Sequence, residues 1–367
     1  MQTIVISAVN LRKGGTLTIL RQCLEYLSSV AVEKHWRVVA LVHQQELANF
    51  PNIEYIEMPH SVQSWVSRLR CEHFEMKKAT AHLGEIDLWL SLHDTTPTIQ
   101  AKRRAVYCHN SFPFLKWKWR HLLQNWGIVT FAALTKHVIY RPNIHKNDYL
   151  IVQQEWFRKA MHKMFRYPQE HIIVSLPTTH HQPIAPKTVP TAKYHFIFAA
   201  YHDINKNFEC LCEAARLLEE EMGTEAFEVT LTIGQEDSKY AKWLAKKWGN
   251  VASIHFAGFQ NKDNLYQLYQ QADCLVFPSL VETWGLPISE FAVSGKPMLL
   301  ANLPYAHETA AGYPKAAFFN PDSPEQLKQQ MKALVQGDTT ILSTVPKVSM
   351  SEPLAHSWGE VFSILLK

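Results

Sequence analysis

The chain has 367 residues, of which 47% are hydrophobic and 19% charged, and its formal net charge is +4. This length exceeds what one hydrophobic core usually serves, so it predicts two domains of roughly 180 residues each. The composition excludes disordered and fibrous proteins, and no stretch approaches the ~20 apolar residues that a membrane-spanning helix needs.

The first half alternates short apolar runs with amphipathic stretches, which is the pattern of a parallel sheet covered by helices. The opening run, Thr3–Val9, is strand-sized and lacks the layout of a signal peptide, so we expect a first strand there. Further strands are expected at Arg37–Val42, Ile53–Glu57, Leu88–Leu92, Ala105–Cys108, Tyr149–Val152 and Ile172–Val174, with a helix at Glu155–Phe165.

A proline-rich stretch separates the halves. Residues 176–192 read LPTTHHQPIAPKTVPTA, and their four prolines are incompatible with a regular element. We therefore expect a first domain over residues 1–178, a linker over residues 179–192 and a second domain over residues 193–350. Residues 351–367 are expected to form an amphipathic helix, from about Pro353 to Leu366, that can pack back on the first domain.

The second half repeats the alternation of strands and helices. Strands are expected at Tyr194–Ala200, Glu228–Ile233, Ser253–Phe256, Cys274–Phe277, Met298–Leu300 and Ala316–Phe319. Helices are expected at Asn207–Glu221, Lys239–Trp248, Lys262–Gln271, Pro287–Ser294 and Pro324–Val335. In such sheets ligands bind beyond the carboxyl ends of the strands, so we expect the chemistry in the loops that follow strands.

Six scattered cysteines show neither Cys-x-x-Cys spacing nor a dense disulfide framework, which suits a reducing cytoplasm.

The loop after Cys274–Phe277 is the most informative. Pro287 suits the first turn of a helix, and Gly285 permits close approach of a ligand to the N–H groups at the helix start, a site suited to a diphosphate. Glu282 precedes this helix and Glu290 lies within it. One carboxylate could therefore reach a sugar and the other a ribose diol. Taken alone, two such acids are more often a dipole-stabilising acid and a solvated one.

The whole run resembles the retaining group 1 glycosyltransferases, the glycogen and sucrose synthase-like family, whose signature is two glutamates separated by seven residues. The matching residues are Glu282-Thr-Trp-Gly-Leu-Pro-Ile-Ser-Glu290, preceded by Phe277-Pro278-Ser279 and followed by Gly295-Lys-Pro297. The resemblance implies the GT-B fold, in which two Rossmann-like doubly wound domains face each other across a cleft. It also implies transfer of a hexose from a nucleotide diphosphate, UDP or GDP, with retention of configuration. The residues implied at the donor are Glu282 at the sugar, Thr283, Trp284, Gly285 and Leu286 at the diphosphate, and Glu290 at the ribose.

The stretch Ala199-Ala-Tyr-His-Asp-Ile-Asn-Lys-Asn-Phe208 follows the first strand of the second domain. The resemblance implies that Lys206 binds the diphosphate and offsets charge on the leaving group, with Asn205 beside it. The family commonly has an arginine about five residues before this lysine, where this chain has Tyr201 or His202. The alternative for Lys206 is a solvated lysine at a helix start.

Three further positions resemble family loops. Gly14 and Gly15 follow the first strand, where the family has a glycine-rich loop facing the donor phosphates and the acceptor; a tight turn is the alternative. His109 follows the strand Ala105–Cys108, where a family histidine lines the donor-sugar pocket; a structural histidine is the alternative. Gly258 lies in a loop that would flank the nucleobase, or is an ordinary turn.

A basic and aromatic stretch, FPFLKWKWRH, spans Phe112–His121. It lies within a region, residues 102–171, that has thirteen Lys and Arg residues against three acids. Aromatic rings with interspersed cations suit an anionic membrane surface or a lipid-linked acceptor. Nucleic-acid binding and packing of the rings in the core are the alternatives, and we expect no nucleic-acid partner.

The motifs that the chain lacks also narrow its function. It contains no Asp-x-Asp, no phosphate-binding Gly-x-x-x-x-Gly-Lys-Ser/Thr loop, no Gly-x-Ser-x-Gly elbow and no His-Glu-x-x-His helix. We therefore expect no metal and no cofactor beyond the donor itself. The expected protein is a cytoplasmic glycosyltransferase, peripheral on the membrane, that acts on a glycan or lipid-linked acceptor in surface polysaccharide or glycolipid synthesis. An epimerase, a phosphorylase and a non-catalytic nucleotide-sugar-binding module are the alternatives.

Overall fold

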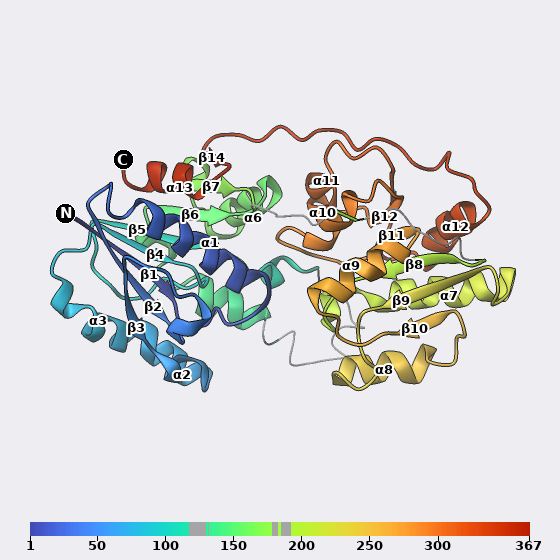
Figure 1. Cartoon of the computed structure of the whole chain (residues 1–367), viewed down its shortest axis with the longest axis horizontal. Helices are drawn as coiled ribbons and strands as arrows, with labels where there is room; N and C mark the ends of the chain where they lie inside the picture. The colour runs from blue at the N-terminus through green and yellow to red at the C-terminus, as the bar shows by residue number, and fades with distance from the viewer. Residues whose placement is uncertain (117–129, 131, 178–182, 185–191) are drawn as a thin grey trace. The chain divides into compact units, whose positions relative to one another are not determined.

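The computed structural model describes residues 1–116, 130, 132–177, 183–184 and 192–367. The chain divides into two compact units, and in each one a parallel sheet is covered by helices (Figure 1). The first unit is built from Met1–Pro113, Phe131–Thr178 and Met350–Lys367, and the second from Phe114–Thr130 and Thr179–Ser349. Most of the expected linker lies outside the described residues.

The first unit contains an eight-stranded sheet with the order β14-β7-β6-β5-β4-β1-β2-β3, in which every neighbouring pair is parallel. Its strands are β1 (Gln2–Ala8), β2 (Trp36–Val42), β3 (Ile53–Glu57), β4 (Leu88–Ser91), β5 (Arg103–Tyr107), β6 (Tyr149–Val152), β7 (Ile172–Ser175) and β14 (Leu354–Ala355). Its labelled helices are α1 (Gly14–Val30), α2 (Trp65–Arg70), α3 (Met76–Ala79), α6 (Glu155–Phe165) and α13 (Trp358–Leu365).

Helices bury both faces of this sheet, which explains why its central strands β1 and β4 are mostly apolar and buried. Ile4 and Ile6 of β1 point into one core, together with Leu24 of α1, whereas Val5 points into the other core, together with Met76 of α3. Alternate strand residues point to opposite faces, so each face has its own hydrophobic core.

The C-terminal segment differs from its expected form. The expected helix from about Pro353 to Leu366 was wrong at its start, because Leu354–Ala355 form β14, which pairs with β7. The helix α13 begins only at Trp358, where the Ser357 side chain accepts a hydrogen bond from the Glu360 N–H and caps it. The helix packs on the first unit, where the rings of Tyr26 and Phe362 stack with centroids 5.7 Å apart.

The second unit contains a six-stranded parallel sheet with the order β10-β9-β8-β11-β12-β13. Its strands are β8 (Tyr194–Phe198), β9 (Phe227–Leu231), β10 (Ile254–Phe256), β11 (Cys274–Phe277), β12 (Met298–Ala301) and β13 (Ala316–Phe319). Its helices are α7 (Phe208–Met222), α8 (Lys239–Trp248), α9 (Lys262–Gln271), α10 (Leu286–Ala292), α11 (Pro304–Thr309) and α12 (Pro324–Val335).

Strand order fixes where a ligand can bind in each unit. The order reverses between β1 and β4 in the first sheet and between β8 and β11 in the second. At such a switch point the two following loops diverge to opposite faces and leave a crevice at the carboxyl edge. The fold therefore directs attention to the loops after these four strands. Among the described residues, every helix is too short or too polar to cross a bilayer.

Candidate functional site

The switch point of the second sheet brings together two residues that lie 76 positions apart in the sequence. Lys206 ends the turn after β8, and Glu282 lies in the loop after the neighbouring strand β11. The Lys206 Nζ atom lies 2.6 Å from the Glu282 Oε1 atom, and the two side chains are 16% and 13% exposed. Solvent can reach this ion pair, so an anionic ligand could compete with Glu282 for the ammonium group.

Two asparagines hold the loop after β11 in place. The Asn205 amide donates to the Val281 carbonyl at 3.1 Å, and the Asn207 amide donates to the Pro278 carbonyl at 3.2 Å. Asn207 has a left-handed backbone (φ +57°), a conformation that asparagine tolerates, and no motif in the sequence pointed to it. The Asn205 Oδ1 atom is buried and has no partner in the described structure, so it could accept a hydrogen bond from a ligand hydroxyl.

The turn between Glu282 and α10 is tightly built. Gly285 has φ +87°, and a Cβ atom there would lie 3.3 Å from Ile288 and 3.5 Å from Phe277, so both backbone angle and space favour glycine. The Trp284 indole N–H donates to the Ser289 hydroxyl at 3.2 Å. In the described structure, the backbone N–H groups of residues 283–286 have no acceptor within the chain. These amides could bind an anion.

Glu290 lies on α10, and its partly buried side chain is near Tyr269 of α9. Burial raises the pKa of its carboxyl group, while the Lys262 ammonium group and the Tyr269 hydroxyl act in the opposite direction. The Tyr269 hydroxyl lies 3.5 Å from Glu290 Oε2. Lys262 was not singled out from the sequence, since its proximity to Glu290 depends on how α9 packs on α10.

The loop after β10 contributes an exposed aromatic ring. Gly258 has φ +74°, and Phe259 beside it is 69% exposed. The Phe259 ring stacks with that of Tyr201, which is 50% exposed, with centroids 6.2 Å apart. Tyr201 and His202 are the two candidates for the position where the resemblance implies an arginine, and Tyr201 presents an aromatic face rather than a positive charge.

In the first unit, His109 lies in the loop after β5 and is held by Asp94. The Asp94 carboxylate accepts hydrogen bonds from the His109 N–H at 2.5 Å and from the Tyr140 hydroxyl at 2.7 Å. The His109 Nε2 atom lies 3.1 Å from the Leu92 carbonyl. Burial lowers the pKa of His109, so at neutral pH the imidazole is neutral and Nε2 carries the proton. Its Nδ1 atom then remains as a hydrogen-bond acceptor.

Gly14 and Gly15 form the first turn of α1, directly after the loop that follows β1. Gly14 has φ +63°, and a Cβ atom there would meet nothing within 4 Å, so its conformation rather than its surroundings favours glycine. His109, Gly14 and Gly15 therefore lie at the carboxyl edge of the first sheet, and Lys206, Glu282, Glu290 and Gly258 lie at or near that of the second.

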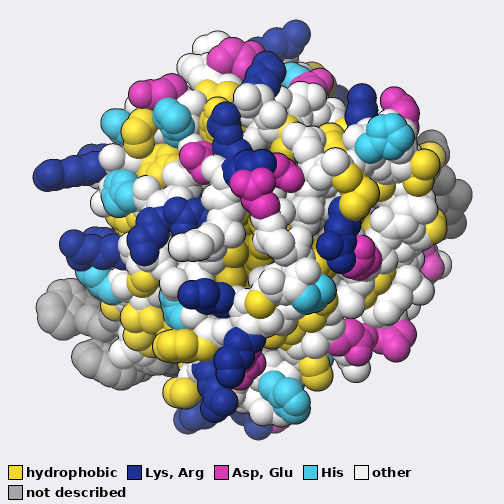
Figure 2. Space-filling model, turned by 90° about the vertical axis from the view of Figure 1, so that its left-hand side faces the viewer, with side chains coloured by type: hydrophobic (Ala, Val, Ile, Leu, Met, Phe, Trp, Pro, Cys, Tyr) yellow, Lys and Arg dark blue, Asp and Glu magenta, His cyan; other side chains and the backbone are white. Residues whose placement is uncertain are grey.

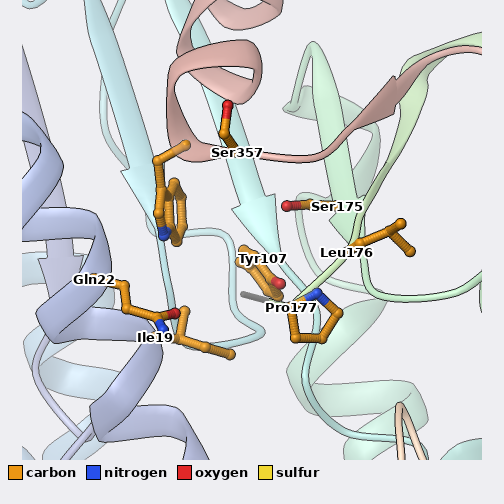
Figure 3. A pocket seen from close by; sticks show the side chains of 8 residues that line it. Ile19, Gln22, Tyr107, Ser175, Leu176, Pro177 and Ser357 are labelled. Carbon is orange, nitrogen blue, oxygen red and sulfur yellow. The ribbon is translucent and has the colours of Figure 1, made fainter. Parts of the chain in front are cut away.

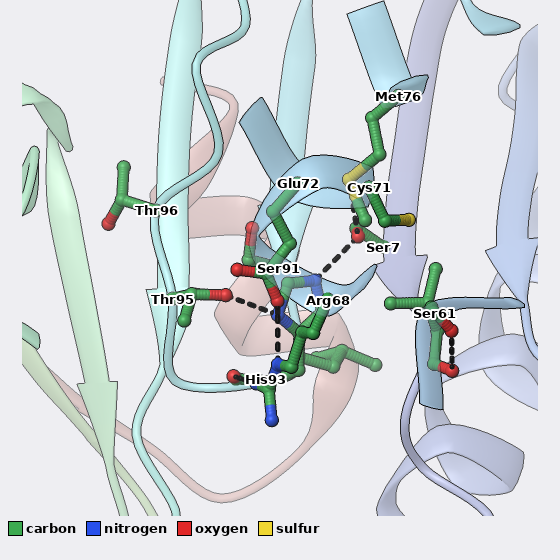
Figure 4. A network of polar contacts seen from close by, with 12 residues as sticks. Ser7, Ser61, Arg68, Cys71, Glu72, Met76, Ser91, His93, Thr95 and Thr96 are labelled. Atoms are coloured by element: carbon green, nitrogen blue, oxygen red, sulfur yellow. Dashed lines mark hydrogen bonds and ion pairs between the residues drawn. The ribbon is translucent and has the colours of Figure 1, made fainter. Parts of the chain in front are cut away.

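A buried polar network near the switch point of the first sheet was missed in the sequence (Figure 4). His93 follows β4, and its Nε2 atom lies 2.6 Å from the Ser7 hydroxyl of β1. Arg68 donates to the Glu72 carboxylate at 2.8 Å and to the His93 carbonyl, also at 2.8 Å. Glu72 lies in a π-helical turn, Cys71–Glu75. No motif spacing links these residues, so only the packing of the helix on the sheet reveals the network.

Other features contribute less to the site. A small cavity between α1, β5 and α13 is lined by residues of the first unit alone, including Gln22, Tyr107 and Ser357 (Figure 3). Residues 117–121 of the stretch Phe112–His121 lie outside the described residues, so the role of the stretch stays a prediction. Within the described ranges, no three His, Cys, Asp or Glu residues gather where they could hold a metal ion, and the expectation on metals stays a prediction too.

Part of the chain is similar in sequence to known glycosyltransferases. Residues 183–343 match the family described as glycosyl transferases group 1. The lipopolysaccharide glucosyltransferase WaaG of Escherichia coli (strain K12) is 32% identical over 130 residues, which are 35% of this chain and 30% of WaaG. The chain thus matches less than a third of the length of this curated relative.

Solved structures resemble the whole chain. Sucrose-phosphate synthase from Thermosynechococcus elongatus superposes with a TM-score of 0.66 and 13% identity, over 100% of this chain and 95% of that one. The structure of WaaG superposes with a TM-score of 0.61 and 14% identity, over 91% of this chain and 90% of that one. Anabaena Alr3699/HepE in complex with UDP and glucose superposes with a TM-score of 0.59 and 15% identity, over 93% of this chain and 92% of that one. At these identities the likeness concerns the fold, and it confirms the expected GT-B fold with its two Rossmann-like domains.

Proposed function

We propose that the protein transfers a sugar from a nucleotide diphosphate donor to a glycan or lipid-linked acceptor with retention of configuration. The match of residues 183–343 to the group 1 glycosyltransferases supports this proposal. The observation that carries this proposal is the contact of 2.6 Å between Lys206 and Glu282 at the switch point of the second sheet. This contact supports the proposal because it brings a cation and a carboxylate together at the carboxyl edge of the sheet, where ligands bind in open parallel sheets.

The donor end of the reaction is assigned to the second unit. Lys206 and the backbone amides of residues 283–286 bind the diphosphate, because both present N–H groups to an anion. Glu290 accepts hydrogen bonds from the ribose hydroxyls. Glu282 shares its negative charge between Lys206 and the hydroxyls of the donor sugar.

The first unit is assigned to the acceptor. Gly14 and Gly15 are exposed at the start of α1, so the backbone there is accessible to a ligand. The free Nδ1 acceptor of His109 suits a sugar hydroxyl, and Asp94 fixes the backbone of this histidine.

The transfer step needs no protein base. The acceptor oxygen forms a bond to the anomeric carbon on the face from which the diphosphate leaves, while the bond between that carbon and the phosphate oxygen breaks. The acceptor proton passes to the departing phosphate oxygen. Lys206 and the amides of the turn stabilise the negative charge that develops there, which is the electrostatic contribution that usually dominates in such sites.

The comparisons support a donor with UDP and an acceptor in a surface glycan. HepE was solved with UDP and glucose, and WaaG is a glucosyltransferase of lipopolysaccharide. We place the reaction in the cytoplasm, in the synthesis of a surface polysaccharide or glycolipid.

The proposal is tested by incubating the protein with UDP-, GDP- and ADP-sugars and measuring nucleotide diphosphate release, with and without candidate acceptors. We expect release from one donor, a product whose anomeric configuration matches that of the donor, and loss of turnover in Glu282→Ala. Tight nucleotide binding without turnover for any acceptor would instead favour a binding module. Sugar isomers formed without an acceptor would favour an epimerase.

A further inference from the structure

One face of the first unit exposes large apolar side chains on a single helical segment. The segment runs from α2 through the π-helical turn Cys71–Glu75 into α3. Its residues Trp65, Val66 and Phe74 are 44%, 76% and 69% exposed. Such large apolar side chains gathered on one surface usually mark a place where another surface docks.

These residues belong to a continuous helical stripe. Val66, Leu69, Arg70, His73 and Phe74 follow a spacing of three and four residues, and together they line one side of a groove of about 690 Å³. Thr98 and Asn143 also line this groove, and the His73 Nδ1 atom lies 2.8 Å from the Thr98 hydroxyl. We call this surface, with Trp65, Lys77 and Lys78, the α2–α3 face.

Its opposite side is buried, which fixes its orientation. Cys71, Glu72 and Met76 are fully buried, and Cys71 and Met76 belong to the core under the sheet. The segment therefore has two different sides. Its inner side is buried in the core, and its exposed outer side combines apolar and cationic groups. A helical stretch of this kind can lie flat on a membrane surface.

The charge of the α2–α3 face is positive. Lys77 and Lys78 continue the stripe one turn beyond Phe74 and are exposed. Arg70 is also exposed and pairs with Glu75 at 3.0 Å, so it contributes no net charge. Exposed Arg141 lies two residues before Asn143 at the groove. Figure 2, viewed from the left-hand side of Figure 1, shows Lys and Arg side chains lying beside hydrophobic ones.

The α2–α3 face adjoins the carboxyl edge of the first sheet. Arg68 of α2 donates to the carbonyl of His93, the second residue after β4. The next residue, Asp94, accepts the hydrogen bond of the His109 N–H. A membrane that contacts this segment would therefore lie close to the loops assigned to the acceptor.

We propose that the α2–α3 face docks the protein on an anionic phospholipid membrane, with Trp65, Val66 and Phe74 entering the headgroup region and Lys77 and Lys78 meeting lipid phosphates. Apolar insertion and cationic attraction together give stable peripheral binding, whereas either one alone is weak. A second copy of the chain fits less well, because two positive faces would repel. Docking does not depend on the proposed reaction, since it concerns the surface alone.

The test is sedimentation of the full chain with vesicles, without donor or acceptor. We expect binding to vesicles of phosphatidylcholine mixed with phosphatidylglycerol, little binding to phosphatidylcholine alone, and weakening by added salt. The charge variant Lys77→Glu/Lys78→Glu and the apolar variant Val66→Ser/Phe74→Ser should each bind about tenfold more weakly. All four side chains are exposed, so thermal unfolding should be unchanged.

Two matched controls test whether binding depends on the α2–α3 face itself or on exposed charge and apolar side chains anywhere on the protein. Lys239→Glu/Lys246→Glu changes two exposed lysines on α8, and Val32→Ser removes an apolar side chain that is 67% exposed at the end of α1. Both should bind like the unaltered protein. The proposal is overturned if the unaltered protein fails to bind anionic vesicles, if the target variants bind as well as the controls, or if the chain forms a dimer that Val66→Ser/Phe74→Ser dissociates. A chain that sediments but transfers no sugar would contradict only the proposed reaction.

Discussion

The two sheets each have an ion pair near their switch point, and the two pairs differ in access to solvent. In the second sheet, Lys206 and Glu282 are 16% and 13% exposed and lie 2.6 Å apart. In the first, Arg68 and Glu72 are 13% and 0% exposed, with the Arg68 Nε atom 2.8 Å from the Glu72 carboxylate. The cations are similarly exposed, but Glu282 is reached by solvent whereas Glu72 is fully buried. We call the Lys206–Glu282 pair open and the Arg68–Glu72 pair sealed.

The partners of each pair explain what the difference means. The Arg68 guanidinium binds both Glu72 and the His93 carbonyl, so its planar group fixes a helix to a loop. Burial lowers the pKa of His93 to about 4, so the network contains a neutral imidazole at physiological pH. Lys206, by contrast, has a flexible stem and one carboxylate partner that a ligand can replace. The sealed pair holds the fold, and the open pair is available for chemistry.

The largest expected effect lies in the sealed pair. Arg68→Ala leaves the Glu72 carboxylate buried without its partner, so we expect the free energy of unfolding to fall by about 3–5 kcal/mol. Denaturant unfolding measures it. Arg37→Ala is the matched control, because Arg37 makes a similar 2.8 Å pair with Glu54 on the surface. That control should cost about 1 kcal/mol or less. Equal losses in the two variants would show that the network is not a structural element.

The next effect tests the open pair. Lys206→Ala should lower kcat roughly 10²- to 10³-fold with little change in stability, because it removes charge stabilisation of the leaving diphosphate. Glu282→Gln should also lower turnover, yet nucleotide diphosphate should bind at least as tightly, since the Lys206 ammonium group is then free of its competitor. Turnover assays and calorimetric titration with the nucleotide measure both. Lys328→Ala, on α12, is the control, and weaker nucleotide binding in Glu282→Gln would contradict the proposed competition.

A smaller effect concerns Glu290 and pH. Burial raises its pKa, so the folded state holds this proton more tightly than the unfolded state does. Its charged form therefore opposes folding above the raised pKa, and this penalty disappears as the pH falls through that pKa. The affinity for the donor should have the opposite pH dependence. It should fall as the pH falls, because the ribose hydroxyls bind the ionised form of the Glu290 carboxyl group.

The variant Glu290→Gln checks this assignment. At neutral pH it should make the protein slightly more stable, weaken donor binding roughly ten- to hundredfold through loss of hydrogen bonds to a charged group, and flatten the pH dependence of that binding. Titrations with the donor between pH 5 and pH 8 supply the measurement. An unchanged pH profile would remove Glu290 from the donor site.

The smallest expected effect lies in the turn that shapes the open site. Gly285→Ala forces a side chain into a left-handed conformation and against Ile288 and Phe277, so we expect a loss of roughly 1–2 kcal/mol in stability. Gly14→Ala is the control for conformation alone, because no atom lies within 4 Å of its Cβ position. If the two variants lose equal stability, the close packing around Gly285 is irrelevant.

The sequence alone predicted most of the fold, and it predicted the candidate residues of the second unit as a family resemblance. Strands such as β6 and β11 were placed at their observed bounds, because a buried parallel strand is a short apolar run between polar segments. The segment around β14 was expected to be helical, because two residues are too few to show a strand pattern. Their pairing with β7 depends on where the returning chain meets the sheet.

By itself, the sequence determined the two-unit α/β organisation and the spacing of Glu282 and Glu290, since both are written in local patterns. Only the tertiary structure decided that Lys206 touches Glu282, that Tyr201 stacks on Phe259, and that Arg68, Glu72 and His93 form one sealed network. The physical reason is the order of the strands. Parallel pairing of β8 with β11 brings distant loops to one edge, and a linear pattern of residues contains no record of which strands will be neighbours.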